Sequence, residues 1–250
     1  MNINESTDAP RVDWRNVNDR LVRSIKPVAQ PVAISFVAED EDSGLPRLDY
    51  PYPVANTEGR TGQVPAGCVF WIHGSHTTFE TKAGDHANCS VGSYTHGFLT
   101  LEEAASKDDV SAVLESGWVD QAAVRDLPVV SQKPDKVIYG PLSEATSSPD
   151  VVLLRVNGLG LMTIKNACPE MRIEGKPQCH IVAIAKEYGV VAASVGCALS
   201  RSRTGMKAEE MTCAIPGMIL EELSTSIEDM AKLDRAMATY ASEDAKRFLR

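Results

Sequence analysis

Hydrophobic residues recur at helical spacing near both ends of the chain. Trp14, Val17, Leu21 and Ile25 repeat every three or four residues, which predicts a helix with Asp13 as its N-cap. Near the C-terminus, a second pattern of this kind predicts a long amphipathic helix. Its apolar face consists of Leu220, Leu223, Ile227, Met230, Leu233, Met237 and Tyr240.

Short, almost wholly apolar runs between these helices predict buried strands. Residues 31–37 read Pro-Val-Ala-Ile-Ser-Phe-Val, and residues 151–156 read Val-Val-Leu-Leu-Arg-Val. Similar patterns predict further strands at 77–81, 137–139 and 190–194. Helical spacing predicts helices at 101–118, 119–127, 158–167 and 179–188, while 66–74 fits either a short buried helix or a strand. Because strands and helices are interspersed, the sequence predicts an α/β or α+β fold.

Two windows of the chain read as copies of one pattern. Each runs from a cysteine through an apolar stretch and a strand-like stretch to a second cysteine beside glycine. The first copy holds Cys68 and Cys89, and the second holds Cys179 and Cys197. The first cysteines of the two copies are 111 residues apart and the second cysteines 108, so the register is nearly kept. If the copies pack face to face, their four thiols meet at one pseudo-symmetric site.

The repeat predicts two pseudo-repeated halves packed as one globular unit. The first half spans 13–130, and the second half, with the C-terminal helix, spans 131–250. Residues 1–12 are predicted to form a disordered tail. The polar segment from about 39 to 64 is predicted as a long loop, of the kind that often serves as a lid or a binding loop.

Composition limits the classes of function. The chain has 250 residues, of which 43% are hydrophobic and 24% charged, as is usual for a soluble globular protein. Its net charge of −9 argues against a nucleic-acid surface, which needs a basic stripe. It has no 18-residue apolar run and a polar, acidic start, so we expect no membrane span, no signal peptide and a cytoplasmic location. Thiols in that compartment are normally reduced.

The first hypothesis for the cysteines is a metal centre. Four thiolates, from Cys68, Cys89, Cys179 and Cys197, suit a [4Fe–4S] cluster, with zinc as the alternative. The chain lacks the Cys-x-x-Cys spacing that is typical of such sites. The competing interpretation is that these cysteines are small buried side chains packed against glycine turns. For any single cysteine that interpretation is favoured, whereas the doubling of the pattern favours use as a ligand or in catalysis.

The second hypothesis is metal-free thiol catalysis. Cys89 lies near His86 and His96, and a neighbouring imidazolium lowers the pKa of a thiol. Cys179 is a second candidate, at the predicted start of a helix. Arg201 and Arg203, which follow Cys197, could hold an anionic group of the substrate through a guanidinium, and the competing interpretation is a surface pair without a function. The predicted catalytic residues are therefore Cys89, His96 and Arg201.

A third class of function is a non-catalytic module that binds a small molecule or assembles as a homo-oligomer through the terminal helix. Methionines are frequent before and within that helix and can form adaptable interfaces, although they more often fill a core. Cys168 and Cys213 lie outside the doubled pattern and are predicted to be packing residues. His73 and His76 are predicted to be solvated surface residues.

Short motifs in a fixed order resemble a known family. They are Pro31-Val32-Ala33-Ile34, Gly67-Cys68, Asn88-Cys89-Ser90-Val91-Gly92, Gly140-Pro141-Leu142, Pro149-Asp150-Val151-Val152, Cys179, Ser194-Val195-Gly196-Cys197 with Arg201, and Ile215-Pro216-Gly217. This order is similar to that of the archaeal-conserved-region family, the domain of unknown function 169, over roughly residues 13–245. The family has no assigned reaction, and the resemblance implies a cytosolic protein with paired-cysteine chemistry.

The sequence as a whole favours a four-cysteine site between two repeated halves. Our leading hypothesis is a metal or iron–sulfur dependent enzyme, of redox or lyase type, that acts on a small and anionic molecule. The alternatives are a metal-free cysteine enzyme and a non-catalytic binding module. Neither nucleic acid nor a membrane is an expected partner.

Overall fold

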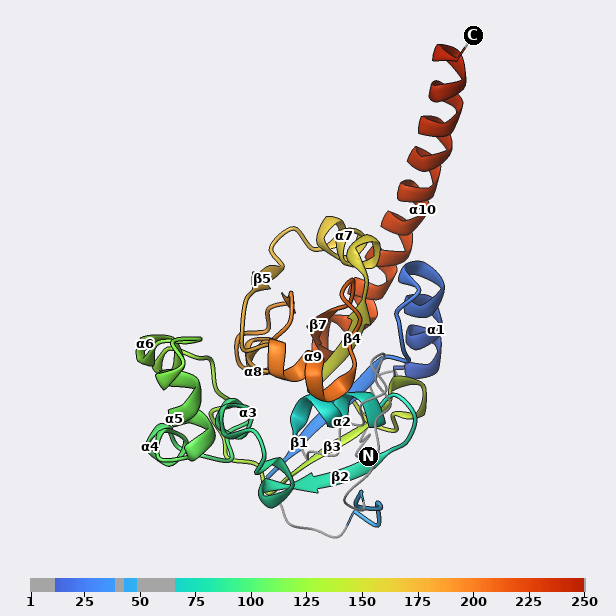
Figure 1. The fold of residues 1–250 in the computed structure, drawn as a ribbon. Coiled ribbons are helices and arrows are strands. Elements are labelled where there is room, and N and C mark those ends of the chain that lie inside the picture. The colour runs from blue at the N-terminus through green and yellow to red at the C-terminus, as the bar shows by residue number, and fades with distance from the viewer. Residues whose placement is uncertain (1–11, 39–42, 49–65, 250) are drawn as a thin grey trace, which may run out of the picture.

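A seven-stranded mixed sheet forms the centre of the computed structural model, which describes residues 12–38, 43–48 and 66–249 (Figure 1). The strand order is β2-β3-β1-β4-β7-β6-β5, and every pairing is antiparallel except that of β5 with β6. The strands are β1 (Val32–Val37), β2 (Phe79–Lys82), β3 (Lys136–Pro141), β4 (Val151–Val156), β5 (Arg172–Glu174), β6 (Ala192–Ser194) and β7 (Met211–Pro216). The mixed α/β class predicted from the sequence is confirmed.

Ten α-helices accompany the sheet in the described ranges. They are α1 (Trp14–Ile25), α2 (Gly67–His73), α3 (Ser90–Thr95), α4 (Leu101–Ala105), α5 (Asp108–Glu115), α6 (Gln121–Arg125), α7 (Gly158–Ala167), α8 (His180–Tyr188), α9 (Ala198–Thr204) and α10 (Gly217–Phe248). The predicted tail and most of the predicted loop at 39–64 lie outside the described residues. Among the helices that are described, none is long and apolar enough to cross a membrane.

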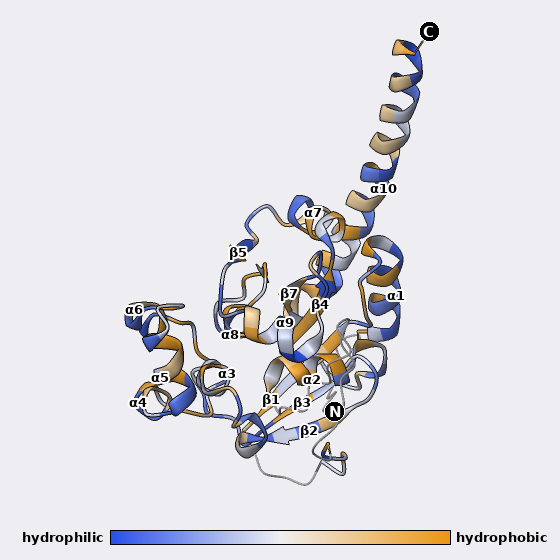
Figure 2. Cartoon of the chain, in the orientation of Figure 1, coloured by the Kyte–Doolittle hydropathy of each residue, from blue (hydrophilic) through white to orange (hydrophobic). Residues whose placement is uncertain are grey.

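The sheet carries a hydrophobic core on each face. Along β4, Val151 and Leu153 belong to one core together with α2 and α8. Val152 and Leu154 point the other way, into a core shared with α1, α7 and α10, as the two-residue period of a strand requires. Figure 2 shows that α1 and α10 carry both hydrophobic and hydrophilic residues, as amphipathic helices do.

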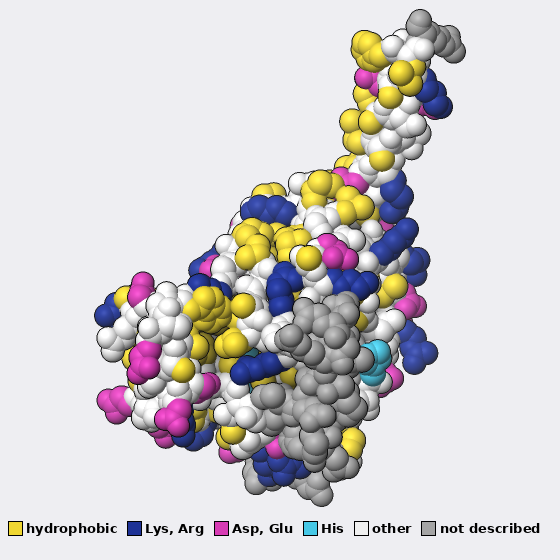
Figure 3. Space-filling model, viewed as in Figure 1, with side chains coloured by type: hydrophobic (Ala, Val, Ile, Leu, Met, Phe, Trp, Pro, Cys, Tyr) yellow, Lys and Arg dark blue, Asp and Glu magenta, His cyan; other side chains and the backbone are white. Residues whose placement is uncertain are grey.

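The terminal helix α10 is anchored at its beginning and exposed at its end. At Gly217 a Cβ atom would lie 1.9 Å from the carbonyl oxygen of Pro149, so only glycine allows this close approach. Leu220 and Ile227 are buried against α1 and α7. The outer part stands away from the body with hydrophobic side chains on its surface (Figure 3). The apolar face predicted for this helix therefore packs into the core in its first half and is exposed in its second half.

A helical lobe, residues 99–130, extends from α3 and contains α4, α5 and α6 (Figure 1). The single helix predicted at 101–118 is wrong, because the chain breaks between α4 and α5. Ser106 is the C-cap of α4, and Lys107 leaves the helical conformation with a φ of −88° and a ψ of 141°. A new helix then starts at Asp108 and Asp109, whose carboxylates suit a first turn.

The order of elements recurs along the chain. In the first half the main elements follow in the order β1, α2, β2, α3 and β3, and in the second half in the order β4, α8, β6, α9 and β7, with further elements between some of them. In both series each of the two helices begins at or near a cysteine. β3 pairs with β1, and β7 pairs with β4. This order agrees with the predicted repeat, but it does not show that the two halves have the same three-dimensional structure. The repeat and its boundary at residue 130 stay predictions.

A buried ion pair joins β4 to the segment before β7. Arg155 Nη2 lies 2.5 Å from Glu210 Oε2, and only 2% of the Glu210 side chain is exposed. The carbonyl oxygen of Glu210 also accepts a hydrogen bond from Arg201. Removing one charge of such a pair leaves the other uncompensated in the interior.

We therefore expect Glu210→Gln to lower the free energy of unfolding by roughly 3 kcal/mol. The measurement is urea denaturation followed by circular dichroism. Glu222→Gln, at an exposed position of α10, is the matched control and should change stability by less than about 0.5 kcal/mol. Equal effects of the two substitutions would contradict a stabilising role for the pair.

Candidate functional site

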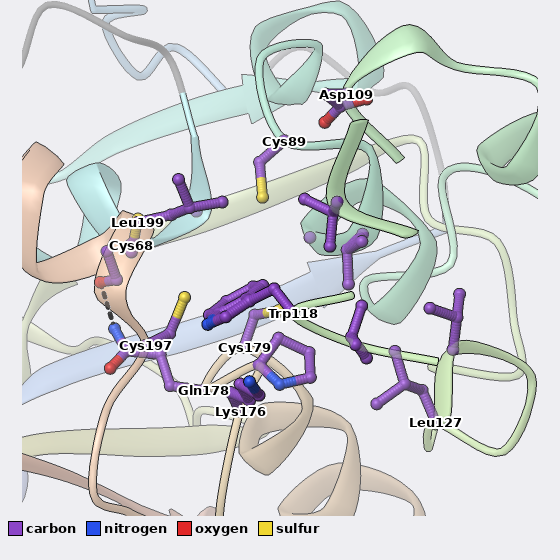
Figure 4. A pocket seen from close by; sticks show the side chains of 18 of the residues that line it. Cys68, Cys89, Asp109, Trp118, Leu127, Lys176, Gln178, Cys179, Cys197 and Leu199 are labelled. Carbon is purple, nitrogen blue, oxygen red and sulfur yellow. Dashed lines mark hydrogen bonds between the residues drawn. The ribbon is translucent and has the colours of Figure 1, made fainter. Parts of the chain in front are cut away.

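All four cysteines of the doubled pattern stand at the beginning of a helix. Cys89, Cys179 and Cys197 are the N-cap residues of α3, α8 and α9, and Cys68 is the second residue of α2. The four helices come from distant parts of the sequence, yet their first turns meet (Figure 4). The structure therefore brings together the four thiols that the sequence singled out.

These thiols line a cavity of about 270 Å³ between the ends of the four helices and the helical lobe. Cys68 and Cys197 lie at one side of the cavity, Leu127 at the other, and Trp118 between them (Figure 4). The remaining wall is mostly apolar and comes largely from the lobe. Its residues include Val91, Ala112, Val113, Val119, Val124 and Leu127, while the polar and charged residues of the lining are Asp109, Lys176, Gln178, Ser200 and Arg203.

The thiols are close enough to influence one another electrostatically. Burial raises the pKa of Cys68 to about 12, with a further contribution from Cys89 and a smaller one from Cys197. Burial also raises the pKa of Cys179 well above its usual value, with Cys89 as the largest contributor among the thiols. Cys68 and Cys179 therefore hold their protons at neutral pH until a positive charge compensates the thiolates.

Arg203 of α9 supplies a positive charge at the cavity wall. Its burial alone would lower its pKa, but the neighbouring Cys89 and Cys68, together with a hydrogen bond to Cys89, raise the pKa above its usual value. No described carboxylate forms an ion pair with Arg203. The guanidinium is thus the natural counter-charge for thiolates or for an anionic ligand.

Arg201, which the sequence analysis selected, does not line the cavity. Its guanidinium donates hydrogen bonds to the carbonyl oxygens of Val195 (2.8 Å), Glu210 (2.7 Å) and Lys207 (2.5 Å). It closes the turn at Gly196, which has a φ of +107° and where a Cβ atom would lie 2.9 Å from Arg201 Nε. The structure therefore places Arg201 as a support for the turn that leads into α9.

His96, the predicted partner of Cys89, is also outside the cavity lining. It is buried behind α2, where its Nδ1 lies 2.9 Å from the carbonyl oxygen of Gly92. Its ring centre lies 5.5 Å from that of His86, whose Nε2 lies 3.0 Å from Thr81 Oγ1. Burial lowers the pKa of His96 to about 4 and that of His86 well below 6.5. Both imidazoles are therefore neutral at physiological pH.

The remaining cysteines are packing residues, as predicted. Cys168 and Cys213 are buried in the core on the other face of the sheet.

Within the described ranges, no group of three or more His, Cys, Asp or Glu side chains is arranged to hold a metal ion. The four cavity cysteines thus surround a space in this conformation and do not converge on one point.

These features define a mixed α/β protein with a thiol-lined cavity between its helix ends. The model of the family described as uncharacterised ArCR, the domain of unknown function 169, matches residues 20–226. The match covers most of the chain, so the protein belongs to this family and the resemblance found in the sequence is confirmed. No curated protein and no solved structure matches the chain.

The buried imidazole of His96 predicts a loss of stability in acid. The unfolded chain protonates a histidine below about pH 6.5, whereas the folded protein resists until about pH 4, so stability present above pH 6.5 is lost as the pH falls through this window. We expect His96 alone to account for a loss of roughly 2 kcal/mol between pH 7 and pH 5. Urea denaturation at the two pH values measures this loss.

His96→Asn is the informative variant, because the amide can still donate a hydrogen bond to Gly92 but does not titrate. Its stability should fall less between pH 7 and pH 5 than that of the unmodified chain. His76→Asn, at an exposed position, is the control and should leave the difference unchanged. The same pH dependence in the His96 variant and in the unmodified chain would contradict the assignment.

Proposed function

We propose that Cys68, Cys89, Cys179 and Cys197 ligate a [4Fe–4S] cluster, and that the protein is an enzyme of redox or lyase type acting on a small molecule in the part of the same cavity that the thiols do not line. One observation carries this proposal: four thiols from four separate helix beginnings line one cavity and act on one another electrostatically. Four cysteine thiolates are the usual ligand set of such a cluster.

We favour a cluster over a single zinc ion. Zinc requires four thiolate sulfurs at about 2.3 Å from one point. A cluster of four irons and four sulfides is larger than one ion, so its four thiolates stand further apart. In the described ranges no three His, Cys, Asp or Glu side chains are arranged to hold a metal ion, so the thiols would have to move to bind either group. Zinc remains the alternative occupant of the same four cysteines.

The chain's own residues prepare the site for an anionic group. Each thiol must release a proton before it can act as a ligand, and burial opposes this release at Cys68 and Cys179. Arg203 reduces this cost at Cys68, because its positive charge lowers the pKa of that thiol. The apolar wall of the lobe limits the access of water, which is one of the factors that set cluster potentials. A bound cluster held by all four cysteines would supply electron transfer, and an iron released by one of them would be Lewis-acidic.

A second candidate function is metal-free thiol catalysis at Cys89. The Cys89 side chain is only partly buried and lines the cavity together with Arg203. A thiol that a substrate can reach is the first requirement of a nucleophile, and the guanidinium could hold an anionic group of that substrate. Both functions suit the reducing cytoplasm, where we propose that the protein acts.

Anaerobic reconstitution with iron and sulfide tests the leading proposal. We expect a brown protein with about four irons and four sulfides per chain. Replacing any one of Cys68, Cys89, Cys179 or Cys197 with alanine should lower the iron and sulfide content to less than about half, because a ligand is lost. Iron and sulfide analysis with an absorption spectrum measures the effect.

The chain supplies its own controls, since Cys168 and Cys213 lie in the opposite core. Cys168→Ala and Cys213→Ala should retain the full cluster content. A protein that stays colourless after reconstitution, or a cluster that survives substitution of Cys179, would contradict the proposal. A colourless protein whose Cys89 is selectively alkylated by iodoacetamide would favour the thiol nucleophile.

A further inference from the structure

The cavity extends beyond the thiols to a region that no cysteine explains. Arg203 lines this region and offers five N–H donors in a planar fork. The residue is half-buried, and no carboxylate in the described ranges forms an ion pair with it. Its donors are therefore available to an anionic ligand.

A flat aromatic surface lies next to this cation. Trp118 belongs to the connection between α5 and α6 and projects into the middle of the cavity (Figure 4). Lys176 Nζ lies 4.4 Å from the centre of its ring, so a second positive charge is held at the indole face. An aromatic ring provides a stacking surface for a planar ligand.

The remaining wall is apolar and limits the size of the ligand. Ala112, Val113, Val124 and Leu127 of the lobe face the cavity. Asp109 also lines it, but its carboxylate already accepts a hydrogen bond from the backbone N–H of Ser90 at 2.9 Å. A volume of about 270 Å³ is at the small end for ligand sites, which favours a small ligand over a nucleotide or a peptide.

We propose that this cavity binds a small aromatic carboxylate, which places its carboxylate against Arg203 and its ring between Trp118 and the apolar wall of the lobe. The inference names the substrate class of the site and rests on the proposed function for its catalytic meaning. Binding itself requires only the residues described above. The probe is therefore benzoate, with benzamide as its neutral analogue of the same shape.

Intrinsic fluorescence gives a direct readout, because Trp118 lines the cavity whereas Trp14 and Trp71 are buried elsewhere. Benzoate should change the emission in a saturable way, and benzamide should bind about tenfold more weakly. Arg203→Gln should weaken benzoate binding about tenfold and leave benzamide binding unchanged, since only the charge-assisted hydrogen bonds are lost. Arg125→Gln, in the exposed part of the lobe, is the matched control.

Trp118→Phe should abolish the fluorescence change while calorimetry still detects binding of benzoate. Arg203→Lys keeps the charge but loses the planar fork, so it should bind benzoate with intermediate affinity if the glutamine variant does not fold. Equal binding of benzoate and benzamide, equal binding of inorganic phosphate, or no binding of benzoate would overturn the proposal.

Iron content measured on the same samples separates this inference from the proposed function. If the protein binds benzoate but takes up no iron, the anion site is supported and the cluster proposal is contradicted. If the protein takes up the cluster but does not bind benzoate, the cluster proposal is supported and the proposed substrate class is contradicted. Benzoate binding that depends on Arg203 in both the loaded and the iron-free protein would support the inference independently of the cluster.

Discussion

The pairing of β1 with β4 is the contact on which the candidate site depends. Residues 32–34 pair with residues 151–153 in the centre of the sheet and join strands from distant parts of the chain. Asp150 reinforces this joint, because one carboxylate oxygen accepts the N–H of Phe36 at 2.7 Å and the other pairs with Lys186 of α8, also at 2.7 Å. As a result α2 and α8 share one core, and Cys68 and Cys179 enter the same cavity.

Strong periodicity is what made parts of the fold predictable. The strands at 31–37 and 151–156 and the helices at both ends carry long, regular apolar patterns, and the structure has all of them. β5 was not predicted, because it has three residues, two of them exposed, and therefore shows no periodic signal. The break between α4 and α5 was not predicted either, because the helical spacing of residues 101–118 runs across it.

The sequence predicted the part of the site that a regular spacing of residues reveals. The regular offset between Cys68 and Cys89 on one side and Cys179 and Cys197 on the other identified the four thiols that line the cavity. Spacing does not reveal which side of a short helix faces a cavity, so Arg201 and Arg203 were both candidates for holding an anion, and only Arg203 lines the cavity. Residues two apart on a helix do not point the same way. The lobe's contribution, including Trp118, arises from tertiary packing alone.

The physical logic of the cavity is a balance of burial and charge. Helix beginnings, an apolar wall and one guanidinium surround thiols that burial keeps protonated, and this balance favours an occupant with negative charge.

The central claim is that the four thiols hold one iron-containing centre. An anomalous difference map at the iron edge, from crystals of the reconstituted protein, tests it most directly. The account predicts one iron peak bounded by the sulfur atoms of Cys68, Cys89, Cys179 and Cys197. Iron bound elsewhere, or by a set that omits the Cys179 or Cys197 sulfur, would contradict it.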